Sequence, residues 1–118
     1  MSTTADLSDV LSDFIDGVYT ATGVAATNNY AVIPIEWADL DGYPEIVVET
    51  SIDDTTYFPA KNVDGQNLTQ PIKLRLPIED GKDLITVNSI FGDTPYVRIV
   101  IYAGKATAGT ISFEINVG

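Results

Sequence analysis

The sequence predicts an all-β protein, a single antiparallel β-sandwich, and two observations carry this prediction. Short apolar runs alternate with polar residues along the chain, as half-buried strands do. Tight-turn pairs separate these runs, because Asp-Gly supplies the positive φ angles of hairpin turns. These pairs are Asp16-Gly17, Asp41-Gly42, Asp64-Gly65 and Asp80-Gly81. The 118 residues are enough for one domain, and a jelly-roll and an immunoglobulin-like topology both fit the pattern.

Seven segments have the alternation and composition of strands. They cover residues 30–37, 45–51, 56–58, 72–76, 84–88, 96–102 and 110–117. Pro34 has no N–H donor, so the first segment is predicted to be an edge or bulged strand. Segment 72–76 is predicted to be a middle strand that turns Ile72, Leu74 and Leu76 to the core. The last two segments are predicted to pair as a hairpin through 103–109, while 21–29 and 61–70 are predicted loops.

The N-terminal residues 1–20 fit two structures, a short helix or an extended arm that runs into a strand near residues 14–20. Apolar residues recur there at helical spacing: Leu7, Val10, Leu11, Phe14 and Val18. Asp13 and Asp16 oppose a helix, because acids at its C-terminal end are unfavourable to the helix dipole. The chain is therefore divided into a short helix or arm at 1–20, expected to pack on a neighbour, and a sandwich domain at 21–118. Deleting the arm is expected to leave the sandwich folded.

The charge balance argues against several partners. Acids outnumber bases 17 to 6, for a net charge of −11, which opposes binding to nucleic acid and to anionic membranes. No apolar stretch approaches the length of a membrane span. Residues 1–9 lack the basic and apolar regions of a secretory signal, so synthesis in the cytoplasm is expected.

Catalytic side chains are scarce in this sequence. It contains no His and no Cys, so Ser51 has no imidazole base and a nucleophilic triad is excluded. Carboxylate pairs remain at Asp39 with Asp41 and at Asp53 with Asp54, but Asp is common in turns for backbone reasons. The sequence therefore indicates a protein that is not an enzyme and needs no cofactor.

Acidic turns and aromatic residues give two candidate binding sites. Loops at one end of a sandwich could gather Asp39, Asp41, Asp53 and Asp93 around calcium, although acid-rich turns without an ion are the favoured interpretation. Stacking on sugar rings is the candidate role of Trp37, Tyr43 and Tyr57. The alternative role of these aromatics is in the core or in a subunit contact, and Trp37 shares an apolar face with Ile33 and Ile35.

Arg98 lies in an otherwise apolar strand, on one face with Tyr96, Val100 and Tyr102. This face is too apolar for simple solvent exposure. Two interpretations are open: the face meets another subunit, or Arg98 forms an ion pair within the sheet with an acid such as Glu49 or Glu114.

One pattern in the sequence resembles a known family. It consists of Trp37, Asp41-Gly42, the strand 46–53 with its Ser-x-Asp end, Tyr57-Phe58-Pro59, the Tyr-Val-Arg-Ile segment 96–99 and the Gly-containing segment 108–111. Over residues 30–117 the chain resembles small β-sandwich structural proteins of tailed bacteriophages, particularly head decoration or auxiliary capsid proteins. The N-terminal 20 residues fall outside the resemblance.

This resemblance implies a virion protein, made in the host cytoplasm, that assembles as a trimer or dimer. Its implied partner is the major capsid protein or another virion component. The residues expected to make contacts are Leu11, Phe14, Tyr96, Arg98 and Tyr102. The alternative function is a carbohydrate-binding module, either a phage host-recognition domain or a glycan-binding accessory domain.

Overall fold

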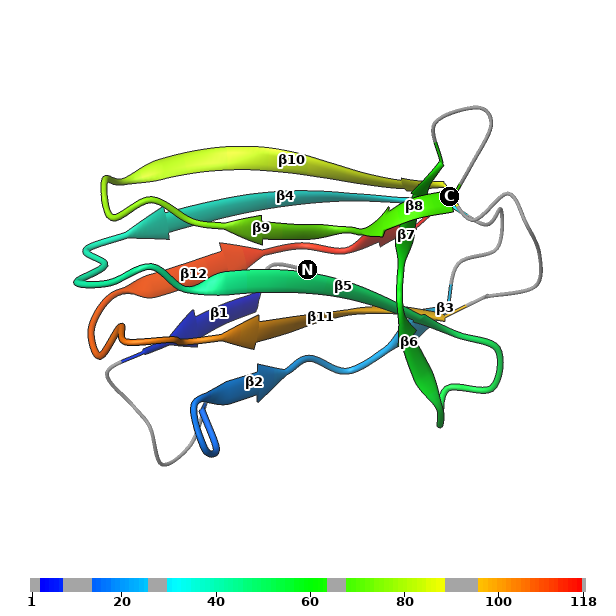
Figure 1. Ribbon diagram of the computed structural model, residues 1–118, viewed down its shortest axis with the longest axis horizontal. Coiled ribbons are helices and arrows are strands. Elements are labelled where there is room, and N and C mark those ends of the chain that lie inside the picture. Colours follow the sequence, from blue (N-terminus) through cyan, green and yellow to red (C-terminus); the bar gives the residue numbers. More distant parts are fainter. Residues whose placement is uncertain (1–2, 8–13, 26–29, 64–67, 89–95, 118) are drawn as a thin grey trace.

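The computed structural model describes residues 3–7, 14–25, 30–63, 68–88 and 96–117, which form strands and no helix (Figure 1). The strands are β1 (Thr3–Asp6), β2 (Val18–Thr20), β3 (Val24–Ala25), β4 (Tyr30–Ala38), β5 (Glu45–Ser51), β6 (Tyr57–Pro59), β7 (Lys61–Val63), β8 (Leu68–Pro71), β9 (Lys73–Arg75), β10 (Gly81–Asn88), β11 (Tyr96–Tyr102), β12 (Thr110–Phe113) and β13 (Asn116–Val117). The predicted all-β class is confirmed.

Two antiparallel sheets form the sandwich. Sheet A has the order β1-β12-β4-β10, and β13 continues β12 along β4. In sheet B, β2 and β3 lie along one edge of β11, β5 lies along its other edge, and β6 and β9 share the far edge of β5. A small hairpin joins β7 to β8.

The strand order distinguishes the two predicted topologies. In an immunoglobulin fold the first two strands share a sheet, whereas here β1 belongs to sheet A and β2 to sheet B. The chain crosses between the sheets again at β4, β5, β10, β11 and β12. This alternation gives a jelly roll.

The core lies between the sheets and consists of the inward residues of each strand. Ile33 and Ile35 of sheet A and Ile46 and Ile99 of sheet B are fully buried. Burying one such side chain contributes about 1.5–3 kcal/mol. The predicted alternation of β5, β11 and β12 is confirmed, because their other residues face outward.

The described N-terminal residues belong to the sandwich itself. β1 pairs with β12, and Leu7 and Phe14 are each 1% exposed. Asp16 and Gly17 have φ angles of 54° and 78°, and Ile15 and Val18 exchange two backbone hydrogen bonds of 3.0 Å around them. Residues 15–18 therefore form a tight hairpin of the kind that Asp-Gly favours.

The strand that contains Pro34 lies at the centre of sheet A, so the predicted edge position is wrong. β4 pairs with β10 on one edge and with β12 and β13 on the other. Opposite Pro34 the backbone N–H of Glu114 donates to the Pro34 carbonyl over 3.3 Å, but Pro34 cannot donate in return. The break between β12 and β13 falls at this residue, and the register continues unchanged beyond it.

Three further strand predictions need correction. β11 and β12 lie in opposite sheets instead of forming a hairpin, because residues 103–109 cross the end of the sandwich and bury Ala103 and Ala106. β9 pairs only with β5 among the described strands and lies at an edge of sheet B. Short strands also occur within the predicted loops, namely β3, β7 and β8.

β10 pairs with β4 along one edge and with no described strand along the other. The free edge carries an acid, Asp83, that protects it from pairing with another chain. Asp83 pairs with Ile35 and so lies on the core-facing side of β10, yet it is exposed. Its Oδ1 accepts the backbone N–H of Leu84 over 2.7 Å. An inward-pointing charge and an occupied edge donor both discourage pairing with another chain.

We expect Asp83→Ala to aggregate through this edge, because the variant frees the Leu84 donor and removes the charge. Static light scattering during incubation at 37 °C should rise faster for Asp83→Ala than for the wild type. Glu79→Ala makes the same charge change on an exposed turn and should behave as the wild type does. Equal scattering from all three proteins would contradict the protective role.

Candidate functional site

The outward residues of sheet B form the first candidate site, the sheet B face. Four strands lie side by side there in the order β9, β5, β11 and β2 (Figure 1). The face comprises Ile15, Val18, Thr20, Glu45, Val47, Glu49, Lys73, Arg75, Tyr96, Arg98, Val100 and Tyr102. Register places Val18, Tyr102, Glu45 and Arg75 in one row across it.

An apolar stripe crosses the sheet B face. Val100 and Val47 are direct cross-strand neighbours and are only 4% and 9% exposed, although their side chains point away from the core. Beside them Tyr102 is 41% exposed and Ile15 is 71% exposed. Exposed apolar groups gathered on one face are typical of a surface that contacts another protein.

Arg98 is neutralised within the protomer. Its Nη2 lies 2.7 Å from Glu49 Oε1, and its Nε donates to the same oxygen over 2.8 Å. The two residues are partners in the β5–β11 register. The guanidinium carbon also lies 3.8 Å from the centre of the Tyr57 ring, a cation–π contact. The in-sheet ion pair with Glu49 is therefore present, whereas Glu114 lies outside sheet B.

Tyr57 is held at the end of this face by a second contact. Its hydroxyl donates to Asp54. Burial, together with the hydrogen bond and the charge of Asp54, raises the pKa of Tyr57 to about 12. The phenol therefore stays protonated near neutral pH. A Cβ at Gly23 would overlap the Tyr57 hydroxyl and the Asp54 carboxylate, so a side chain there would have to displace both groups.

The carboxylates of Asp41 and Asp53 are occupied by backbone and hydroxyl donors. Asp41 accepts the hydroxyl and the N–H of Thr107, each over 2.7 Å. These bonds, led by the Thr107 hydroxyl, lower the pKa of Asp41. The N–H groups of Thr56 and Thr55, then the Ser51 hydroxyl, lower the pKa of Asp53. Both acids therefore have structural roles in their turns.

The described residues contain no group of three or more potential metal ligands. Asp39 and Asp41 precede β5, whereas Asp53 follows it at the opposite end. Asp93 lies outside the described residues. The predicted gathering of acids at one end of the sandwich is therefore not seen among Asp39, Asp41 and Asp53.

The three candidate stacking residues are separated. Trp37 is only 8% exposed, and its Nε1 donates to the Glu79 carbonyl over 2.7 Å. Tyr43 is exposed before β5, whereas Tyr57 follows β5 and has Arg98 over its ring. Tyr43 and Tyr57 therefore lie near opposite ends of β5, and Trp37 exposes little of its ring.

The residues expected to make partner contacts divide into two groups. Tyr96, Arg98 and Tyr102 share the sheet B face, as the alternation of their strand predicted. Phe14 lies in the core, where its ring is 5.8 Å from that of Tyr19. Leu11 lies outside the described residues. Pairing across strands adds Ile15, Val18 and Arg75 to the face, which no periodicity within one segment can indicate.

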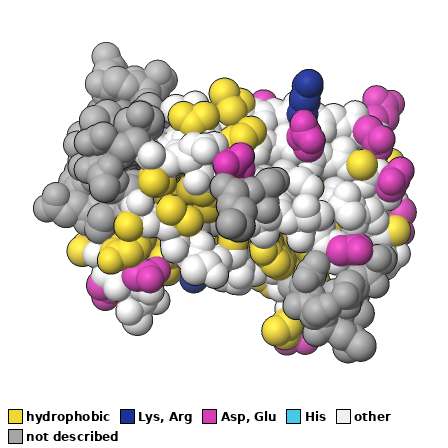
Figure 2. All heavy atoms as spheres, turned by 180° about the vertical axis from the view of Figure 1, so that it is seen from behind, with side chains coloured by type: hydrophobic (Ala, Val, Ile, Leu, Met, Phe, Trp, Pro, Cys, Tyr) yellow, Lys and Arg dark blue, Asp and Glu magenta, His cyan; other side chains and the backbone are white. Residues whose placement is uncertain are grey.

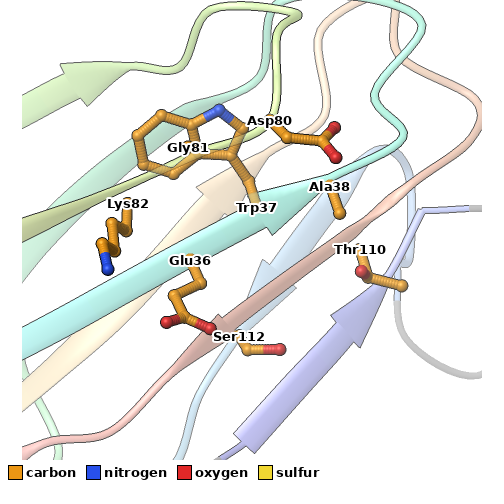
Figure 3. A pocket seen from close by; sticks show the side chains of 8 residues that line it. All are labelled: Glu36, Trp37, Ala38, Asp80, Gly81, Lys82, Thr110 and Ser112. Carbon is orange, nitrogen blue, oxygen red and sulfur yellow. The ribbon is translucent and has the colours of Figure 1, made fainter.

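A groove of about 510 Å³ on the outer face of sheet A is the second candidate site. Its lining residues are Glu36, Trp37, Ala38, Asp80, Gly81, Lys82, Thr110 and Ser112 (Figure 3). Glu36 pairs in register with Lys82 on one side and Ser112 on the other. In the view from behind, hydrophobic and acidic side chains are interspersed on the surface (Figure 2).

No comparison with known proteins assigns this chain to a family. No protein-family model and no curated protein matches the chain. The chain is similar to a solved structure described as "CBM4 structure and function", with 14% sequence identity and a TM-score of 0.46. The match covers 84% of this chain and 59% of the other. The described part of this chain contains no helix that could span a membrane.

Proposed function

We propose that this protein is a non-enzymatic structural subunit of a virion, an oligomeric head decoration or auxiliary protein that binds the capsid surface. The sequence resemblance over residues 30–117 supports the class of protein. The observation that carries the mode of action is the apolar stripe on the sheet B face, where Tyr102 and Ile15 are exposed beside Val100 and Val47.

The proposed mechanism is the burial of the exposed part of this stripe, Tyr102 and Ile15, against a neighbouring subunit, because Val100 and Val47 are already covered within the chain. Removing apolar surface from water contributes about 25 cal/mol per Å² before the costs of association are subtracted. Arg98 enters such a contact already paired with Glu49, which reduces the desolvation penalty of an isolated charge. The charged residues at the rim of the face then set the orientation of the partner.

Self-association gives the first test. The wild type should sediment as an oligomer at about 100 μM, a concentration suited to interfaces of modest size. Tyr102→Lys places a charge in the stripe and should shift the protein to monomer. Leu84→Lys makes a similar change at a residue that is also exposed, on the outer side of β10, and should leave the oligomer intact. A wild type that stays monomeric would contradict the proposal.

The virion location needs a separate experiment. Intact phage particles from the source of the chain should be labelled on their heads by antibody against the protein and viewed by electron microscopy. Label confined to material outside the particles would contradict a role in the virion.

The sheet A groove favours a second candidate function, carbohydrate binding. Carboxylate, ammonium and hydroxyl groups converge there from Glu36, Lys82, Thr110 and Ser112, and such groups hydrogen-bond sugar hydroxyls. Trp37 also lines the groove and is the single Trp of the chain. Sugar titration should therefore change its fluorescence saturably, and Glu36→Ala should abolish the change. An unchanged spectrum across a glycan panel would contradict this function.

A further inference from the structure

The charges of the chain are unevenly distributed between the sheet B face and the rest of the sequence. The strands of this face carry three of the six cations, Lys73, Arg75 and Arg98, but only two of the seventeen acids, Glu45 and Glu49, and a third acid, Asp16, lies in the hairpin at its edge. A second copy can therefore approach this face without the repulsion expected from a net charge of −11.

Two charged residues, Arg75 and Asp16, lie at opposite edges of the face. Arg75 is exposed on β9 at one edge, and the hairpin Ile15–Val18 with exposed Asp16 forms the other. Register places Arg75 in the row of Glu45, Tyr102 and Val18. Neither Arg75 nor Asp16 has an ion-pair partner among the described residues.

Resting on the self-association proposed above, we propose that two copies of this chain bind each other through their sheet B faces as a symmetric dimer. The two-fold axis runs parallel to the strands, between β5 and β11. Each half of such an interface is the same surface, so a residue on one side of the axis meets the residue at the mirrored position of the partner.

This symmetry pairs the residues of the face in a complementary way. The β9 edge of one copy lies over the Ile15–Val18 hairpin of the other, which places Arg75 beside Asp16. Across the axis, Val100 lies over Val47 and Arg98 over Glu49, because these pairs are register partners of β11 and β5. An axis perpendicular to the strands, near Val47, brings Arg75 to the β6 end of the face, where the acid of that row, Glu49, is already paired with Arg98. Charge complementarity therefore selects the parallel axis.

The size of the face sets the expected strength of the dimer. Four strands about 4.8 Å apart, with about 3.3 Å per residue along β11, give a flat area of about 20 Å by 23 Å. Two such faces cover about 900 Å², which is smaller than most stable interfaces. We therefore expect a dimer that dissociates at micromolar concentrations.

Sedimentation velocity of the full chain between about 1 and 500 μM tests the proposal. Arg75→Glu should weaken the dimer at least tenfold, because the change acts twice in a symmetric interface. Asp16→Lys should weaken it similarly, and the double variant Arg75→Glu/Asp16→Lys should restore it to within about threefold of the wild type. Lys82→Glu reverses a charge on sheet A and should have no effect.

Two measurements separate this proposal from the proposed function. Asp16 has a positive φ, so Lys at this position is strained. Asn tolerates this conformation, so Asp16→Asn should weaken the dimer without the strain. Thermal melts check that each variant folds. A trimer, or a dimer that Arg75→Glu leaves unchanged or the double variant fails to restore, overturns the paired arrangement and leaves self-association standing. A wild type that is monomeric throughout overturns both.

Discussion

Deleting residues 1–20 is expected to abolish folding. The deletion removes β1 and β2 together with Leu7 and Phe14, which are buried in the core. Truncation of one such Leu or Phe to Ala costs about 2–5 kcal/mol. The combined loss matches or exceeds the total stability of about 5–15 kcal/mol that a domain of this kind has. Circular dichroism of the deletion variant should show no cooperative thermal transition.

A pair of point variants isolates the physical cause of this effect. Phe14→Ala should lower the free energy of unfolding by about 3–5 kcal/mol, measured by urea denaturation. Ile15→Ala removes the neighbouring apolar side chain, which is exposed, and should change it by about 0.5 kcal/mol or less. If the deletion variant melted cooperatively near the wild-type temperature, residues 1–20 would be a separable arm, as the sequence analysis expected.

Gly109→Ala is expected to be the most damaging substitution among the glycines that the structure describes. Gly109 has a φ of 107°, which is unfavourable for any residue with a Cβ. A Cβ there would also lie 2.8 Å from the carbonyl oxygens of Ala38 and Asp39. These are backbone atoms, so the strand end itself must move. We expect a loss of about 3–5 kcal/mol in the free energy of unfolding.

Gly17→Ala is the matched control for Gly109→Ala. Gly17 also has a positive φ, of 78°, but no atom lies within 4 Å of the position its Cβ would take. Gly17→Ala should therefore lower the free energy of unfolding by about 1–2 kcal/mol, through conformational strain alone. Urea denaturation of both variants compares strain alone with strain plus a backbone clash. Equal losses would show that the contacts of Gly109 contribute nothing.

Much of the fold could be predicted because alternation within a strand is a local property. The inward faces of β5, β11 and β12 follow directly from it. The pairing of strands does not, because the jelly roll joins segments that are distant in sequence. Pro34 is an example. Its missing N–H predicted an edge strand, but β4 lies inside sheet A, and the strand opposite Pro34 forms one hydrogen bond fewer at that position.

The candidate sites were only partly predictable for the same reason. Tyr96, Arg98 and Tyr102 share a face because they alternate along one strand. Glu49 was named as a partner of Arg98, but its choice over Glu114 depended on which strands are neighbours. Trp37 is of a residue type that can stack on sugar rings. Register places it beside Gly81, however, and it is only 8% exposed.

The pairing of β1 with β12 constrains when the protein acquires its structure during synthesis. Thr3 lies opposite Phe113, so β1 has no partner until the ribosome has added the 110 residues that separate the two (113 − 3). At about 5–20 residues per second this interval lasts about 5–20 s. Sheet A therefore stays incomplete through this interval, and a nascent-chain chaperone would meet β1 while Ala5 and the adjacent Leu7 still face water.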